Sequence, residues 1–144
     1  MPSTRRQADP LRVRDGDDAF IALVIAAMDA SGHVSAEEAA RAHDIIWATR
    51  RFRRRSGEVV DRRIDRMRQM LGTRGPTALI EAAARQLAVR DRLAAFAVAA
   101  DIVLVDGRMA RAESAFLTRL ARLLGLDADA ARNIRNVIRI KNSA

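Results

Sequence analysis

Residues 93–105 read LAAFAVAADIVLV, and Asp106 and Gly107 follow directly. A helix over this stretch is apolar on every side except at Asp101, and a helix of that kind lies in the middle of a bundle. Asp-Gly is a turn sequence, and Glu113 stands six residues past the glycine, near the start of a further helix. The stretch therefore predicts the most buried helix of the chain, a tight turn, and a second helix with Glu113 near its start.

An earlier stretch repeats this arrangement. Gly32 aligns with Gly107 across 75 residues, and Glu38 then aligns with Glu113. An apolar helix, residues 19–28, precedes Gly32, and a helix headed by Glu38 follows it. The chain thus contains two copies of a helix, a short glycine turn and a second helix with a glutamate near its start. This arrangement indicates an internal repeat.

Helical periodicity and capping residues continue through the rest of the chain, and no segment alternates with the period of two that strands require. We therefore predict an all-α, single-domain bundle of about seven helices that contains two pseudo-repeated helix–turn–helix pairs. Its domain covers residues 18–144 and follows a flexible tail, residues 1–17. The expected helices cover about residues 17–30, 35–54, 57–71, 77–87, 91–105 and 110–124, and a last one starts at 127.

The composition excludes several classes of function. The chain has 144 residues and no cysteine, so disulfides and thiolate metal sites are absent. Aromatic residues make up 3% of it and none is tyrosine, which disfavours a stacking surface for single-stranded nucleic acid. No Ser/His/Asp constellation and no phosphate-binding glycine loop occurs, so we do not expect an enzyme.

The apolar runs are too short for a membrane-spanning helix, which needs roughly 20 residues. Asp15, Asp17 and Asp18 precede the first apolar run, where a signal peptide would carry basic residues. A cytoplasmic location is therefore expected.

The net charge of +8 is concentrated in the middle and at the end of the chain. Residues 41–74 hold eleven Arg and four acidic residues, whereas residues 1–40 hold four Arg and seven acidic residues. Such a cluster could bind phosphates of nucleic acid or an anionic membrane. The alternative is a solvated basic face, because acidic residues are interleaved at the spacing of surface ion pairs. The candidate anion-binding residues are Arg62, Arg63 and Arg66.

Three segments resemble the TerB-like family, the tellurite-resistance TerB proteins and their relatives. Residues 26–38 read AAMDASGHVSAEE, residues 101–113 read DIVLVDGRMARAE and residues 120–126 read LARLLGL. The resemblance covers about residues 19–138. It implies an all-α domain, an association with bacterial responses to tellurite and other chemical stresses, and metal binding by acidic turn residues.

The candidate metal ligands are Asp106 and Glu113 at the second turn, with Asp101 nearby. Turns between helices can offer a hard cation such as calcium both carboxylates and backbone carbonyls. From the residues alone, a second interpretation is a plain Asp-Gly turn followed by a helix start, where Glu113 would bind free amides. Asp101 is expected either beside the ion or in a buried ion pair, and its candidate partners are Arg85, Arg108 and Arg111.

At the first turn the candidate ligands are Glu38 and Asp29. The family usually has Asp-Gly here, whereas this chain has Ser31 before Gly32, so we expect the first turn to bind metal more weakly or not at all. Glycine and glutamate match positions 6 and 12 of a calcium-binding EF-hand loop in both copies, but both lack the first acid of that loop. We therefore treat the two turns as lookalikes of an EF-hand.

The sequence thus predicts a cytoplasmic, non-enzymatic stress-response module. It would bind a divalent metal ion or a protein partner through its acidic inter-helix turns. The alternative is a basic module that contacts nucleic acid or an anionic membrane through its arginine-rich middle helices.

Overall fold

The structure of the chain, a computed structural model, describes residues 11–32, 36–104 and 111–144, without the side chains of residues 36–39 and 41. Over these residues the chain forms α-helices and one short 3-10 helix and no strand, which confirms the predicted all-α class. The elements in order are α1 (Gly16–Ala30), α2 (Ala36–Ala48), η1 (Arg50–Phe52), α3 (Gly57–Gln86), α4 (Val89–Val103), α5 (Arg111–Leu123) and α6 (Ala128–Asn142).

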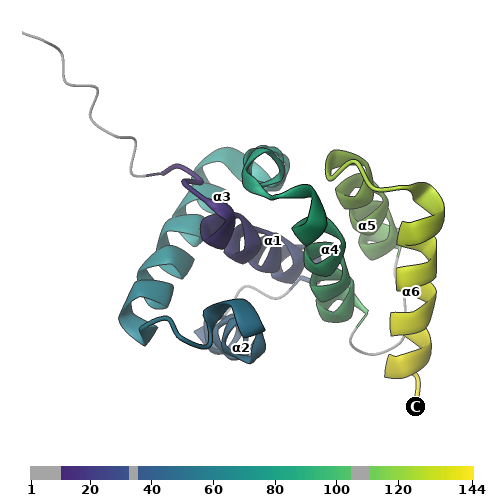
Figure 1. Ribbon diagram of the computed structural model, residues 1–144, viewed down its shortest axis with the longest axis horizontal. Coiled ribbons are helices and arrows are strands. Elements are labelled where there is room, and N and C mark those ends of the chain that lie inside the picture. The colour runs from purple at the N-terminus through teal and green to yellow at the C-terminus, as the bar shows by residue number, and fades with distance from the viewer. Residues whose placement is uncertain (1–10, 33–35, 105–110) are drawn as a thin grey trace, which may run out of the picture.

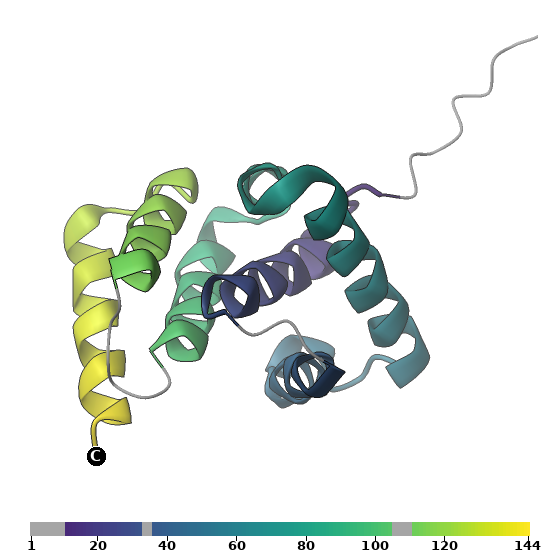
Figure 2. The ribbon, with the colours of Figure 1, turned by 180° about the vertical axis from the view of Figure 1, so that it is seen from behind.

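Helix α1 runs through the middle of the bundle, where α3 and α4 pack against it (Figures 1 and 2). Every residue from Asp17 to Met28 is buried. Helix α6 packs on α4, on the side away from α3 (Figure 1). The helices that flank the two predicted turns are α1 and α2, and α4 and α5, whereas residues 33–35 and 105–110 between them lie outside the described residues.

The prediction that residues 93–105 form the most buried helix is wrong. Phe96 and Leu104 are fully buried as expected, but Leu93 is 44% exposed, and α1 is covered over a greater length. Both helices are rich in apolar residues, so composition did not separate them. The difference arises because neighbours surround α1, whereas α4 keeps part of its first turns open to solvent.

We predicted two helices, residues 57–71 and 77–87, where the structure has the single element α3. The predicted interruption is nevertheless present at Gly75, whose φ of 82° and ψ of 167° are not helical. Pro76 disfavours helical geometry in the residue before it, and glycine adopts a positive φ without a steric penalty. Helix α3 is therefore kinked at Gly75, and the helix count is six instead of seven over the described residues.

The chain packs on the domain before the boundary at residue 18. Helix α1 begins at Gly16, and the side chain of Asp15 caps it by accepting a hydrogen bond from the Asp18 amide. Val13 is 4% exposed. Val13 and Asp17, which we assigned to the tail, are therefore buried against the domain.

The buried position of α1 predicts a large effect of truncating its side chains. Ile21 is fully buried, so we expect Ile21→Ala to lower the free energy of unfolding by about 2–5 kcal/mol. The matched control is Ile140→Ala, because Ile140 is 66% exposed and its truncation should change the free energy of unfolding by less than about 0.5 kcal/mol. Urea denaturation followed by far-ultraviolet circular dichroism measures both, and equal losses would contradict the central position of α1.

Candidate functional site

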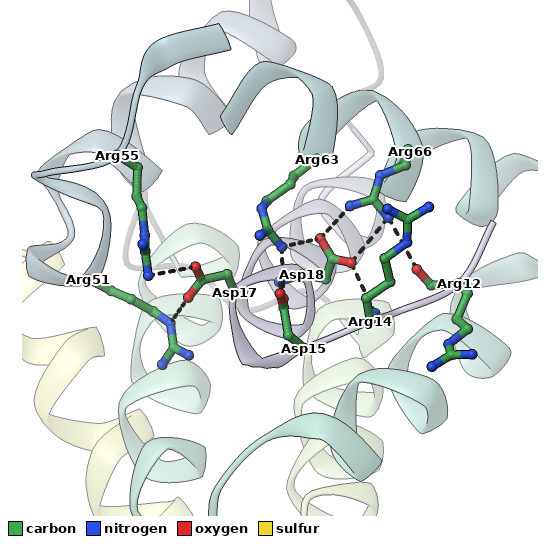
Figure 3. Close-up of polar contacts among 9 residues, drawn as sticks. All are labelled: Arg12, Arg14, Asp15, Asp17, Asp18, Arg51, Arg55, Arg63 and Arg66. Atoms are coloured by element: carbon green, nitrogen blue, oxygen red, sulfur yellow. Dashed lines mark hydrogen bonds and ion pairs between the residues drawn. The ribbon is translucent and has the colours of Figure 1, made fainter. Parts of the chain in front are cut away.

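The first turn of α1 holds two buried carboxylates that face arginines of the middle helices (Figure 3). Asp18 is fully buried. Its Oδ1 accepts hydrogen bonds from Arg63 Nη1 and Arg66 Nη2, both at 2.8 Å, and its Oδ2 accepts from Arg66 Nη1 at 3.1 Å and from the Arg14 amide at 3.0 Å. Arg66 therefore binds Asp18 with two nitrogens, which is the strongest geometry for an arginine–carboxylate pair.

The position of Asp18 in the first helical turn adds to this stabilisation. The free amides and the dipole at a helix N-terminus favour a negative charge. A buried carboxylate without partners would cost several kcal/mol of desolvation. The two arginines of α3 offset that cost only where α3 lies across the start of α1, so the pair fixes the relative position of these two helices.

Asp17 forms a second cluster with the segment after α2. Its Oδ1 accepts a hydrogen bond from Arg51 Nε at 2.6 Å, and its Oδ2 lies 3.2 Å from Arg55 Nη2. Arg51 also donates through Nη1 to Asp91 Oδ2 of α4, at 3.3 Å. Burial alone would lower the pKa of Arg51, but the two carboxylates outweigh it and raise the pKa above its usual value. Arg51 therefore joins α1, η1 and α4.

Of the three candidate anion-binding residues, Arg63 and Arg66 take part in this cluster and Arg62 does not. The side chains of Arg63 and Arg66 are 22% and 20% exposed, and both bind Asp18. Arg62 is 74% exposed and lies 3.7 Å from Glu58. Two of the three arginines thus neutralise the protein's own carboxylates, and Arg62 faces solvent.

The candidate metal ligands fall partly within the described residues. Asp106 and the side chain of Glu38 lie outside them. Asp29 is half-buried in the last turn of α1, and Glu113 is half-buried in the first turn of α5. Neither carboxylate forms a hydrogen bond or an ion pair with another residue of the described part. Over that part, the structure brings no three histidine or acidic side chains together in a way that would hold a metal ion.

Asp101 forms an ion pair, as one of its two interpretations required, but the pair is not buried: the side chain of Asp101 is 47% exposed and that of its partner Lys141 is 60% exposed. Its Oδ1 lies 3.0 Å from Lys141 Nζ and accepts a hydrogen bond from Asn142 Nδ2 at 3.0 Å. Asn142 also donates to the Leu104 carbonyl at 3.0 Å. Lys141 was not among the partners that we considered, because it lies 40 residues further along the chain. Asp101 thereby ties the end of α4 to the end of α6.

Asp101 also lines a shallow groove between α2, α4 and α6, with a volume of about 440 Å³. Its apolar lining comes from α2 and α4, and its polar lining includes Asp101, Lys141 and Asn142. The lining residues are Ile45, Ala48, Thr49, Val98, Asp101, Ile102, Lys141 and Asn142.

Sequence reasoning missed the roles of Asp17 and Asp18, which we considered only as acids that precede the first apolar run. The available signal was the charge distribution, since an acidic N-terminal quarter precedes a strongly basic segment. Opposite charges in two neighbouring segments suggest contact, but they do not say which acid meets which arginine.

The fold and this network define a small helical domain whose central helix starts at a buried acid–arginine cluster. The family model described as tellurite resistance protein TerB matches residues 17–136, so the chain belongs to the TerB family. No curated protein and no solved structure matches the chain closely enough to count as similar. None of the helices in the described ranges is long and apolar enough to cross a membrane.

Removing the charge of Asp18 should strongly destabilise the fold. Asp18→Asn removes the carboxylate that Arg66 binds and one of the two that Arg63 binds, so we expect the free energy of unfolding to fall by about 3–5 kcal/mol. Asp129→Asn is the control, because Asp129 pairs with Arg132 at a side-chain exposure of 80% and should contribute less than about 1 kcal/mol. Urea denaturation of both variants tests this, and a small effect for Asp18→Asn would contradict the role given to the pair.

Asp15 makes the stability depend on pH. Partial burial alone would raise the pKa of Asp15, but the Asp18 amide and the Arg63 guanidinium, 2.8 Å away, hold the pKa below its usual value. A lowered folded-state pKa stabilises the fold fully above the unfolded value of about 3.9, and this stabilisation is lost as the pH falls through the folded-state value.

We therefore expect Asp15→Asn to flatten the acid side of the stability profile. Asparagine keeps the helix cap through its side-chain oxygen but has no charge to titrate. Urea midpoints measured at a series of pH values below about 5 should fall less steeply in the variant than in the wild type. Parallel profiles would show that Asp15 does not contribute to the acid sensitivity.

Proposed function

We propose that the chain is a non-enzymatic, cytoplasmic module of the bacterial tellurite-resistance type that binds a divalent cation such as calcium at its acidic inter-helix turns. Two observations support this: the chain belongs to the TerB family, and the half-buried carboxylates of Asp29 and Glu113 lack a partner among the described residues. The second observation carries the proposal, because other half-buried or buried acids, such as Asp18 and Asp101, have basic partners.

The second turn is the stronger candidate. Helix α4 ends at Val103 and α5 begins at Arg111, so Asp106 lies in sequence between the carbonyl end of one helix and the first turn of the next. The last four carbonyls of a helix have no partner within the helix, and carbonyls together with carboxylates are the ligands that calcium prefers. Asp106 and Glu113 would supply the two charged ligands. Asp101 is held by Lys141 and serves as a neighbouring group.

The first turn offers less to a cation. Ser31 takes the place of the family's aspartate, and its hydroxyl donates a hydrogen bond to the Met28 carbonyl at 2.8 Å. This contact closes the end of α1 and occupies a carbonyl that could otherwise bind an ion. Asp29 and Glu38 are the remaining acids of the first turn, and we expect them to bind more weakly than the pair at the second turn.

The alternative function, an anion-binding basic face, is less well supported by the geometry. It relied on Arg62, Arg63 and Arg66, and Arg63 and Arg66 already neutralise Asp18. An external phosphate would have to compete with a fully buried carboxylate for these donors. A protein partner remains compatible with the family, and the titration below separates it from the ion.

Calorimetric titration of the purified chain with calcium, magnesium, manganese and zinc tests the proposal. We expect Asp106→Asn and Glu113→Gln each to weaken the binding of the preferred cation by on the order of tenfold to a hundredfold, because each removes a charged ligand. The matched control is Glu58→Gln, since Glu58 is an 87% exposed side chain on α3 and its loss should leave binding unchanged.

Each outcome bears on a different part of the proposal. Undiminished binding in both turn variants would exclude the second turn as the site. Absence of heat with every cation would exclude the metal ion and leave a protein partner as the function of these turns. Binding that falls equally in Glu58→Gln would indicate general surface electrostatics instead of a site.

A further inference from the structure

A histidine on α2 has two competing partners for one ring nitrogen. Trp47 Nε1 donates a hydrogen bond to His43 Nε2 at 2.6 Å, and the two rings meet edge to face with centroids 5.6 Å apart. Asp61 of α3 approaches the same nitrogen, and its Oδ1 lies 3.1 Å from His43 Nε2. The two contacts connect an (i, i+4) pair on one helix with a carboxylate on the next.

These two contacts need opposite protonation of His43. The Trp47 indole N–H is a donor only, so Nε2 must carry a lone pair to accept from it. The Asp61 carboxylate is an acceptor only, so Nε2 must carry a hydrogen to donate to it. A single nitrogen cannot satisfy both partners at the same time.

We propose that His43 is a pH-sensitive switch between Trp47 and Asp61. In the neutral imidazole the proton resides on Nδ1, and Nε2 accepts from Trp47. When the solvent supplies a second proton, it binds at Nε2, the Trp47 hydrogen bond is lost, and the new N–H donates to Asp61 in a charge-assisted bond. The side chain of His43 is 32% exposed, so water reaches the ring.

The charged groups around His43 favour Asp61 as its partner. On α2, the neighbouring acid Asp44 is exposed to solvent. On α3, Glu58 pairs with Arg62. The other charged side chains described on η1 and α1 are engaged elsewhere or face solvent. On η1, Arg50 is exposed and Arg51 binds Asp17 and Asp91. On α1, Asp17 and Asp18 bind arginines, and Asp29 lies at the far end of the helix.

The switch changes how α2 is held. In the neutral form, the Trp47 contact lies within α2 and stabilises that helix alone. In the protonated form, the His43–Asp61 ion pair joins α2 to α3.

Trp47 provides a direct measurement, because it is the only tryptophan of the chain. Its fluorescence should change in one transition as the pH is lowered, at constant helical circular dichroism, because protonation of His43 at Nε2 removes the Trp47 hydrogen bond. His43→Gln should abolish the transition. Asp61→Asn should move its midpoint to lower pH, because it removes the carboxylate to which the protonated ring would donate.

The matched control is His33→Gln, which removes the other histidine of the chain and should leave the transition in place. The proposal would be overturned by the absence of a transition in the wild type, by a transition that survives in His43→Gln, or by a fluorescence change that coincides with loss of the helical signal. A midpoint unaffected by Asp61→Asn would exclude Asp61 as the second partner and overturn the switch in this form.

Discussion

The carboxylate of Asp18 is fully buried at the start of the central helix, and its contacts with Arg63 and Arg66 determine where α3 can lie on α1. An unpaired charge there would cost several kcal/mol, so the native arrangement requires these arginines in place. The neighbouring Asp17 extends the same constraint through Arg51 to α4. One end of α1 thus positions both of the helices that cover it.

The pairing of Asp17 and Asp18 with arginines distinguishes charged side chains that stabilise the fold from those that are available to bind a ligand. The arginines that face Asp17 and Asp18 act within the fold, which removes much of the apparent support for an anion-binding face. The acids near the inter-helix turns differ from these arginines because no oppositely charged residue of the described part pairs with them. Asp29 and Glu113 lie at helix ends, away from the arginine cluster, and no described basic residue neutralises them. The proposed cation site therefore relies on carboxylates that no described residue neutralises, whereas the alternative relies on arginines that already bind carboxylates.

Much of the fold could be predicted because helices depend on local sequence. The apolar stretches, the glycine turn and the interruption before Pro76 all indicated helices and their ends, and the TerB-like segments indicated the family that the comparison confirms. Burial was harder to predict, since α1 and α4 are both apolar and only their neighbours distinguish them. The partners of Asp18 and Asp101 lie about 40 or more residues away, so local patterns could not identify them.

The sequence by itself determined the helical class, the repeated helix–turn–helix pairs and the acids at the turns, because these follow from period, capping and turn chemistry within a few residues. Tertiary structure alone decided which charges are neutralised. Asp18 acquires its arginines, Asp101 its lysine and His43 its competing partners only when separate helices pack together. Pairing of charges is a property of distances in space, and the chain reaches those distances only after it folds.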